Sequence, residues 1–305
     1  MNGRPGTTAL ADVKPAIGFA ALALTICTHG LLWPLARVGV HAMPPLWLGF
    51  VRMLSASVFL FVVLALVRQL RMPSRQDIPN VIALGVFMMG IFISLSHVGM
   101  VTVGSGRAAL LGYSTPLWVT PIAILFLGER LGALKGMGLA IGLTGLVILF
   151  NPSDFNWSNN DVVIGNAVLL GAALTWSGCI LYMRTRTYNL NTLQLAPWQL
   201  LAGSAFVLIA ALVLEADRSI DWTEDNILLI VLIGPLGTSV TFWALTTTMR
   251  YLPAITSSIG FLGVPVSITI SATILFGEAL TLIHSVGLAV ITIGLALVTI
   301  AESRE

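Results

Sequence analysis

The side chains of this sequence that could contact a ligand are aromatic rings, hydroxyls and histidines inside long apolar runs. In the stretch GRAALLGYSTPLWVTP, Tyr113 and Thr115 flank Pro116, whose ring nitrogen cannot donate to the carbonyl four residues earlier. Trp176 lies among small residues that allow neighbouring helices to approach closely. An aromatic, hydroxyl-bearing and largely uncharged pocket favours small amphiphilic molecules with an apolar side group. The residues expected to line such a pocket are Trp33, Phe92, Ser96, His97, Tyr113, Thr115 and Trp176.

Each of these residues also has a purely structural interpretation, and both interpretations stay open. Tryptophan is common where helices meet the membrane surface, and Trp176, which lies deeper, could equally well be a core residue. His97 is a candidate for contact with a substrate or a proton, but a neutral histidine can also hydrogen-bond inside a helix bundle. Arg52 could pair with a substrate carboxylate, although contact with a backbone carbonyl is the favoured alternative.

Two prolines and two glutamates recur in similar surroundings. They are candidates for helix kinks and for gating of the two faces of the protein. Pro116 and Pro265 each lie within an apolar run and predict a helix kink beside a central pocket, with simple helix tilting as the alternative. Glu129 and Glu278 each follow a glycine that ends a helix. Each carboxylate is expected to cap the following helix, to hold one face of the protein shut, or to do both.

Several kinds of chemistry are missing from the sequence. The thirteen acidic residues fall in loops, in tails or at helix ends, whereas exporters of cationic drugs generally need a carboxylate at membrane depth. The four histidines have no spacing of four residues between any two, and no phosphate-binding loop is found. The sequence therefore predicts no catalytic residue, no metal, no cofactor and no drive by ATP within this chain.

Composition and periodicity predict an all-α membrane protein. Apolar residues make up 57% of the 305 residues and charged residues only 9%, compared with about 25% charged residues in an average soluble domain. Apolar runs of roughly 18 to 24 residues each match the length of a spanning helix. The ten predicted helices cover 15–37, 45–67, 79–101, 105–127, 132–150, 162–183, 193–214, 226–249, 254–276 and 282–301.

The distribution of lysine and arginine predicts the orientation. With ten helices, eleven of these residues fall on the side of the two termini, and only Arg37 and Arg218 fall on the other side. Because positive charge is retained in the cytoplasm, both termini are expected to be cytoplasmic.

The chain also contains an internal repeat. A shift of 149 residues aligns 105–149 with 254–298 without gaps and gives eleven identical positions, including both prolines and both glutamates. Five helices in each copy would make the second copy enter the membrane from the opposite side, which is a 5+5 inverted repeat. The expected organisation is a cytoplasmic tail at 1–14, a first repeat at 15–150, an extracellular linker at 151–161, an inverted second repeat at 162–301, and a cytoplasmic tail at 302–305.

The ten helices, the two halves and the P-x(11)-G-E-x-L stretch that closes helices four and nine resemble the drug/metabolite transporter superfamily, EamA type. The resemblance covers about 15–301, and its motifs are specific for the fold rather than for the substrate. Within that group, the length and the tryptophan-bearing helices are similar to bacterial exporters of aromatic and other amino acids (YddG type). The resemblance implies efflux across the bacterial inner membrane.

The sequence thus predicts an inner-membrane exporter of small amphiphilic metabolites, with apolar amino acids favoured, that works by alternating access around a midplane pocket. An exporter of drugs or quaternary amines is the second hypothesis, and a membrane-embedded enzyme or receptor is the third. The expected partners are a small-molecule substrate and the lipid bilayer, without nucleic acid. The sequence leaves a monomer and a dimer open, and it leaves open whether the drive is the substrate gradient or a proton.

Overall fold

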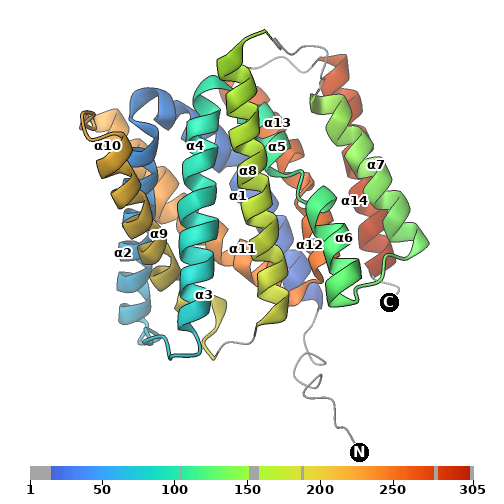
Figure 1. Cartoon of the computed structure of the whole chain (residues 1–305), viewed down its shortest axis with the longest axis horizontal. Coiled ribbons are helices and arrows are strands. Elements are labelled where there is room, and N and C mark those ends of the chain that lie inside the picture. The colour runs from blue at the N-terminus through green and yellow to red at the C-terminus, as the bar shows by residue number, and fades with distance from the viewer. Residues whose placement is uncertain (1–14, 104, 151–157, 187–188, 278–280, 303–305) are drawn as a thin grey trace, which may run out of the picture.

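The structure is a computed structural model that describes residues 15–103, 105–150, 158–186, 189–277 and 281–302. Every regular element in these ranges is a helix (Figure 1). The elements of the first half are α1 (Pro15–Ala42), α2 (Pro45–Leu66), α3 (Ile78–Ile82), η1 (Ala83–Ile91), α4 (Phe92–Thr102), α5 (Ser105–Gly112), α6 (Pro116–Leu127) and α7 (Ala133–Phe150). Those of the second half are α8 (Asn160–Thr185), α9 (Thr192–Leu214), α10 (Glu224–Val231), η3 (Leu232–Thr238), α11 (Ser239–Tyr251), α12 (Ala254–Gly260), α13 (Gly263–Phe276) and α14 (Leu282–Glu302).

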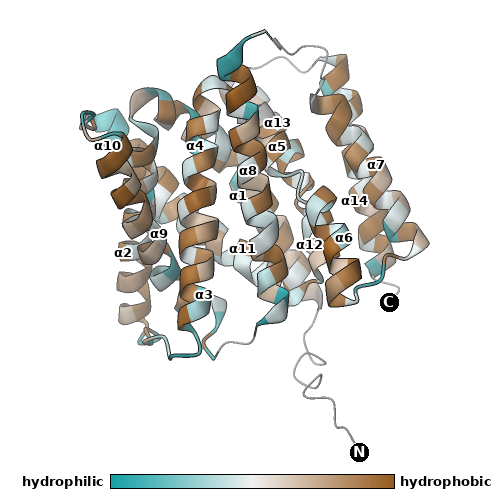
Figure 2. Ribbon diagram, viewed as in Figure 1, coloured by the Kyte–Doolittle hydropathy of each residue, from teal (hydrophilic) through white to brown (hydrophobic). Residues whose placement is uncertain are grey.

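These helices form a multi-pass membrane bundle. Among the described residues, nine helical stretches are long and apolar enough to cross a bilayer, and α7 is a shorter apolar helix. Large apolar side chains such as Leu66, Phe126 and Leu282 are about four-fifths exposed, and apolar residues run along the full length of the ribbons (Figure 2). Such surfaces are stable only against lipid. The all-helical membrane fold is therefore confirmed. The count of ten spans depends on α7, whose 18 residues correspond to about 27 Å.

The helices predicted at 105–127 and 254–276 are interrupted rather than kinked. α5 ends at Gly112, and Pro116 is the first residue of α6, where its missing N–H costs no hydrogen bond. α12 ends at Gly260 and α13 begins at Gly263, so Pro265 lies in the first turn of a new helix. The sequence predicted a kink at each proline, but the helix breaks before it instead. Proline is tolerated in the first turn of a helix and disrupts the interior of one. Interruptions of this kind are stable at membrane depth because they are buried in protein.

Two further irregular segments, η1 and η3, are π-helical and lie within the third and eighth apolar runs. π-Helical turns shift the direction of the side chains that follow and are frequent at functional sites. Here η1 leads into α4, and η3 leads into α11.

The same landmarks recur after 149 residues in both parts of the chain. Gly128 and Gly277 both end a helix in the left-handed conformation, with φ of 68° and 67°, which glycine adopts without strain. The other recurring landmarks are the first residues of helices, namely Ala83 and Leu232, Ser105 and Ala254, and Ala133 and Leu282.

α7 and α14 pack side by side through glycines, at one edge of the bundle (Figure 1). A Cβ atom added to Gly294 would lie 2.6 Å from the backbone nitrogen of Gly142 and 2.7 Å from the carbonyl oxygen of Gly138. Small residues let two backbones approach this closely. Gly138 and Gly142 therefore serve packing within the chain.

We predict that Gly294→Ala lowers the thermal stability of the protein in detergent, because the new methyl group meets backbone atoms that cannot move aside. Overpacking of this kind typically costs about 1–3 kcal/mol. Gly178→Ala is the matched control, because a Cβ atom there meets no atom within 4 Å and alanine favours a helix by about 1 kcal/mol. Equal melting temperatures for the two variants would contradict the packing account.

Candidate functional site

The centre of the bundle contains a cluster of aromatic rings around Trp176. Its ring centroid lies 4.4 Å from that of Phe92 and 5.0 Å from that of Tyr113, both in edge-to-face geometry. Phe261 follows at 5.8 Å and His29 at 6.1 Å. These rings come from α1, α4, α8 and the two interrupted regions of the chain. Their packing brings both halves of the sequence to one point.

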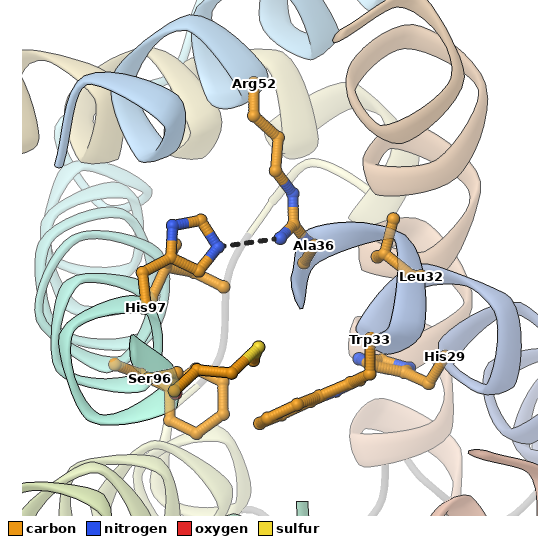
Figure 3. Close-up of a pocket in the computed structure, with 10 residues that line it drawn as sticks. His29, Leu32, Trp33, Ala36, Arg52, Ser96 and His97 are labelled. Atoms are coloured by element: carbon orange, nitrogen blue, oxygen red, sulfur yellow. Dashed lines mark hydrogen bonds between the residues drawn. The ribbon is translucent and has the colours of Figure 1, made fainter. Parts of the chain in front are cut away.

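A cavity lies beside this cluster (Figure 3). Its wall comes from α1, α2 and α4, and in the close-up Arg52 and His97 lie next to each other, with Trp33 and His29 across from them. A second space extends towards α11 and shares five lining residues with the first, namely His29, Leu32, Arg52, Phe92 and Ile93. Its additional lining residues are Met88, Met89, Trp176, Thr238, Thr241, Phe242 and Leu245.

Arg52 is the one charged residue in the lining of these two spaces, and its side chain is held by two described neighbours. Its Nε donates to Thr238 Oγ1 at 2.6 Å, and Thr238 in turn donates to the carbonyl of Ile233 within η3. Its Nη1 lies 3.2 Å from His97 Nε2 (Figure 3). The guanidinium thus links α2 to α4 and to η3. The expectation that Arg52 contacts a backbone carbonyl is not met, because its partners are two side chains.

The tautomer of His97 follows from these contacts. Its Nδ1 lies 3.0 Å from the carbonyl oxygen of Pro45, which can only accept a hydrogen bond, so Nδ1 carries the proton. Nε2 must then accept from Arg52, since a guanidinium only donates. Both ring nitrogens are engaged, and the ring is neutral in this arrangement.

Several buried polar atoms around the site have no hydrogen-bond partner among the described residues. Unpaired buried polar groups are uncommon and typically cost about 1–3 kcal/mol each. A polar ligand or water in the cavity would satisfy those that face it. These atoms are Ser96 Oγ, Tyr113 Oη, Thr115 Oγ1, Trp176 Nε1 and Thr241 Oγ1.

The structure brings most of the predicted pocket residues together. Five of them line one or both spaces, namely Trp33, Phe92, Ser96, His97 and Trp176. Tyr113 contacts the rings of His29, Trp33 and Trp176 instead, and Thr115 is buried at the break before α6 without lining either space.

Sequence reasoning identified Trp176 in the second half but missed the other residues that this half contributes to the aromatic cluster and to the cavity wall. Phe261 and Phe242 lie in apolar runs that also contain serine and threonine, and nothing in their local sequence distinguishes these two rings from core residues. Thr238 and Thr241 could have been found as paired hydroxyls one turn apart within an apolar helix.

Glu129 connects the two halves at the face where α1 begins. Its carboxylate accepts hydrogen bonds from the backbone nitrogens of Ala254, at 2.8 Å, and Ile255, at 2.9 Å. It also lies 3.5 Å from Nε of Arg184 at the end of α8. Glu129 therefore caps α12 in the other half of the chain, and the prediction that it caps the helix following it is wrong. Glu278 lies outside the described residues.

Other carboxylates make comparable contacts at the helix ends. Glu302 pairs with Lys135 at 2.7 Å and accepts from the Thr256 hydroxyl at 2.5 Å. At the start of α2, Glu215 accepts hydrogen bonds from the backbone nitrogens of Leu46 and Trp47.

Asp77, just before α3, joins two loops outside the spans. It accepts from Ser74 and from the backbone nitrogens of Asn189 and Leu190. Burial alone would raise the pKa of Asp77, but these hydrogen bonds outweigh burial and lower it below its usual value.

Within the described ranges, no three His, Cys, Asp or Glu side chains gather in a group that could hold a metal ion. Aromatic faces, hydroxyls and one guanidinium can bind and orient a small molecule.

Comparison with known proteins agrees with this arrangement. The model of the EamA-like transporter family matches residues 16–151 and again residues 163–300. The chain is 26% identical over 293 residues to the uncharacterized transporter YoaV of Bacillus subtilis, covering 96% of this chain and 99% of that protein. It is 27% identical over 291 residues to the uncharacterized inner membrane transporter YedA of Escherichia coli, covering 93% and 91%.

A solved crystal structure shares the fold, with a TM-score of 0.72 at 19% identity over 92% of this chain and 99% of that one. The family match spans nearly the whole chain in two copies. The protein is a transporter rather than an enzyme, and it belongs to the EamA-like transporter family.

Proposed function

We propose that this protein is an inner-membrane exporter of small amphiphilic metabolites and that amino acids with aromatic or other apolar side chains are its favoured substrates. The observation that carries the proposal is the central cavity. Phe92 and Trp176 supply apolar aromatic surface there, while Arg52 and unpaired hydroxyls supply polar contacts. Aromatic walls with a few convergent polar groups are typical of small-molecule sites. The family and the inner-membrane name of YedA support the location.

Alternating access is the proposed mechanism, based on a 5+5 inverted repeat with halves at 15–150 and 162–301. The recurrence of helix starts, π-helical segments and left-handed glycines after 149 residues supports equivalent halves. The two matches to the family model support the same division. Because five helices form each half, the second copy is inverted, and the cavity between the halves can open to either side in turn. Export rather than import rests on the resemblance to amino-acid exporters.

Glu129 is the proposed latch of one face. It ties the loop after α6 to the start of α12 and to Arg184 on α8. The surplus of lysine and arginine at this end supports its assignment as the cytoplasmic face, with both termini there. Opening that face would require the carboxylate to release two backbone donors.

The hypothesis of a cationic-drug exporter is less favoured by this cavity. Arg52 is the charged residue in its wall, and no carboxylate lines it among the described residues. A quaternary amine would meet like charge there, and the attraction of aromatic rings for cations is only about 0.5–2 kcal/mol.

Transport by purified protein in liposomes tests the function directly. We expect uptake of labelled phenylalanine, leucine, methionine and threonine, and we expect Trp176→Ala to reduce phenylalanine transport by at least about tenfold, given the usual cost of removing a buried aromatic side chain. Trp222→Ala serves as the control, since Trp222 is 59% exposed and lines neither space. No movement of any amino acid would contradict the proposed substrate class.

The drive is predicted to be the substrate gradient. His97 uses both nitrogens to hold Pro45 and Arg52, and a second proton on Nε2 would face a guanidinium. An imposed pH gradient is therefore expected to leave the initial rate of wild-type transport unchanged. A rate that follows the gradient and is lost in His97→Ala would show proton coupling instead.

The latch is testable by cysteine labelling. In a variant without Cys27 and Cys179, the buried residue Ser257 of α12 is replaced by cysteine and labelled with a maleimide in detergent. Glu129→Ala is expected to speed labelling roughly 2- to 30-fold, which corresponds to the usual loss of a helix cap. The exposed Asp217→Ala is the control and should leave the rate unchanged. Unchanged labelling in Glu129→Ala would rule out a latch.

A further inference from the structure

The cavity contains a buried positive charge that the described protein does not neutralise. Arg52 is 6% exposed and lies within the second membrane-spanning helix. Its hydrogen bonds are one from Nε to Thr238 and one from Nη1 to His97, and both acceptors are neutral. A guanidinium has five N–H donors. Three of them, including both on Nη2, therefore have no hydrogen-bond acceptor among the described residues.

Three described carboxylates at helix ends, those of Glu129, Glu215 and Glu302, are engaged elsewhere. Glu129 and Glu302 are held at one face by backbone nitrogens, Arg184, Lys135 and a threonine. Glu215 is held near the start of α2 by backbone nitrogens. None of these lines the space beside Arg52. The described part of the chain thus offers the guanidinium no counter-ion.

A charge in this position is costly. Removing an unpaired ion from water costs several kcal/mol, and ionisable groups within a bilayer normally pair or face a functional cavity. Arginine also matches a carboxylate better than other cations do, because two parallel N–H groups can bind both oxygens. An anionic ligand group in the cavity would satisfy both the charge and the free donors.

We propose that Arg52 is the binding residue for the substrate's carboxylate and that a free carboxylate, rather than an amine, is what the site requires. This inference rests on the proposed function, since it names the part of the substrate that is recognised. The carboxylate lies against the free donors of Arg52. The apolar side group lies against Phe92 and Trp176, which line the space that Arg52 also lines.

The amino group of the substrate has a weaker, neutral partner. His29 lines both spaces. Its Nδ1 lies 3.0 Å from the carbonyl oxygen of Thr25, so Nδ1 carries the proton and Nε2 presents a lone pair. Nε2 and the unpaired hydroxyl of Ser96 can accept from an amine without forming an ion pair. Loss of the amine should therefore weaken binding much less than loss of the carboxylate.

The experiment compares three ligands that differ only in their charged groups. Binding of phenylalanine, 3-phenylpropanoate (no amine) and phenylalaninamide (no carboxylate) to the purified full-length protein is measured by calorimetry in chloride-free buffer. We expect phenylalaninamide to bind roughly 10- to 100-fold more weakly than phenylalanine, as for loss of a charge-assisted hydrogen bond. We expect 3-phenylpropanoate to stay within about tenfold of phenylalanine.

A matched pair of variants assigns the effect to Arg52. Arg52→Lys keeps the charge and should retain the preference for a carboxylate, whereas Arg52→Gln should bind phenylalanine and phenylalaninamide with similar affinity. Circular dichroism and melting temperature show whether each variant folds. If Arg52→Gln does not fold, the ligand series on the wild-type protein still decides the question.

The outcomes separate this inference from the proposed function. Equal binding of phenylalanine and phenylalaninamide to the wild-type protein would overturn the role of Arg52 and leave amino-acid transport standing. Binding of 3-phenylpropanoate without binding or transport of any amino acid would support the carboxylate site and overturn the amino-acid proposal. A preference for phenylalanine that persists unchanged in folded Arg52→Gln would also overturn the inference.

Discussion

Hydrocarbon cannot hydrogen-bond a peptide group, and this constraint governs every part of the bundle. It confines the described chain to helices, because only helices satisfy the backbone locally. It also decides where helices can be interrupted. The break between α5 and α6 and the break between α12 and α13 both lie in the buried interior, where protein surrounds the freed carbonyl and amide groups.

The same constraint explains why carboxylates are found at helix ends. A helix start has free N–H groups, and at two helices of this protein a glutamate from a distant segment accepts hydrogen bonds from two of them. Glu129 does so for α12, and Glu215 does so for α2. Each contact joins a residue of one half of the chain to a helix of the other. A cap that bridges two halves is broken whenever they separate, so the proposed latch follows from the geometry of the cap itself.

The interior of the site combines well-packed aromatic rings with polar atoms that lack hydrogen-bond partners among the described residues. Aromatic rings pack edge to face around Trp176 and need no further partner, whereas the polar atoms beside them are only partly paired. A protein core normally pairs such atoms. The incomplete pairing, together with the uncompensated guanidinium of Arg52, distinguishes this region from ordinary packing and supports its assignment as a binding cavity.

The sequence by itself determined that the chain lies in a lipid bilayer and where its helices lie. Long apolar runs predicted the nine candidate spans of the described residues to within a few residues, since hydrophobic length and the need for internal hydrogen bonds leave few alternatives. The sequence also determines that His29 lies one helical turn from Trp33 and Phe92 one turn from Ser96, because this spacing is a local property of a helix. Only the tertiary structure decided which distant groups meet. That Glu129 caps α12 and that Arg52 contacts His97 and Thr238 depends on how separate helices pack, and no local pattern encodes such contacts. Partners more than a hundred residues apart are selected by the shape and charge of the assembled bundle, which exists only once the helices have come together.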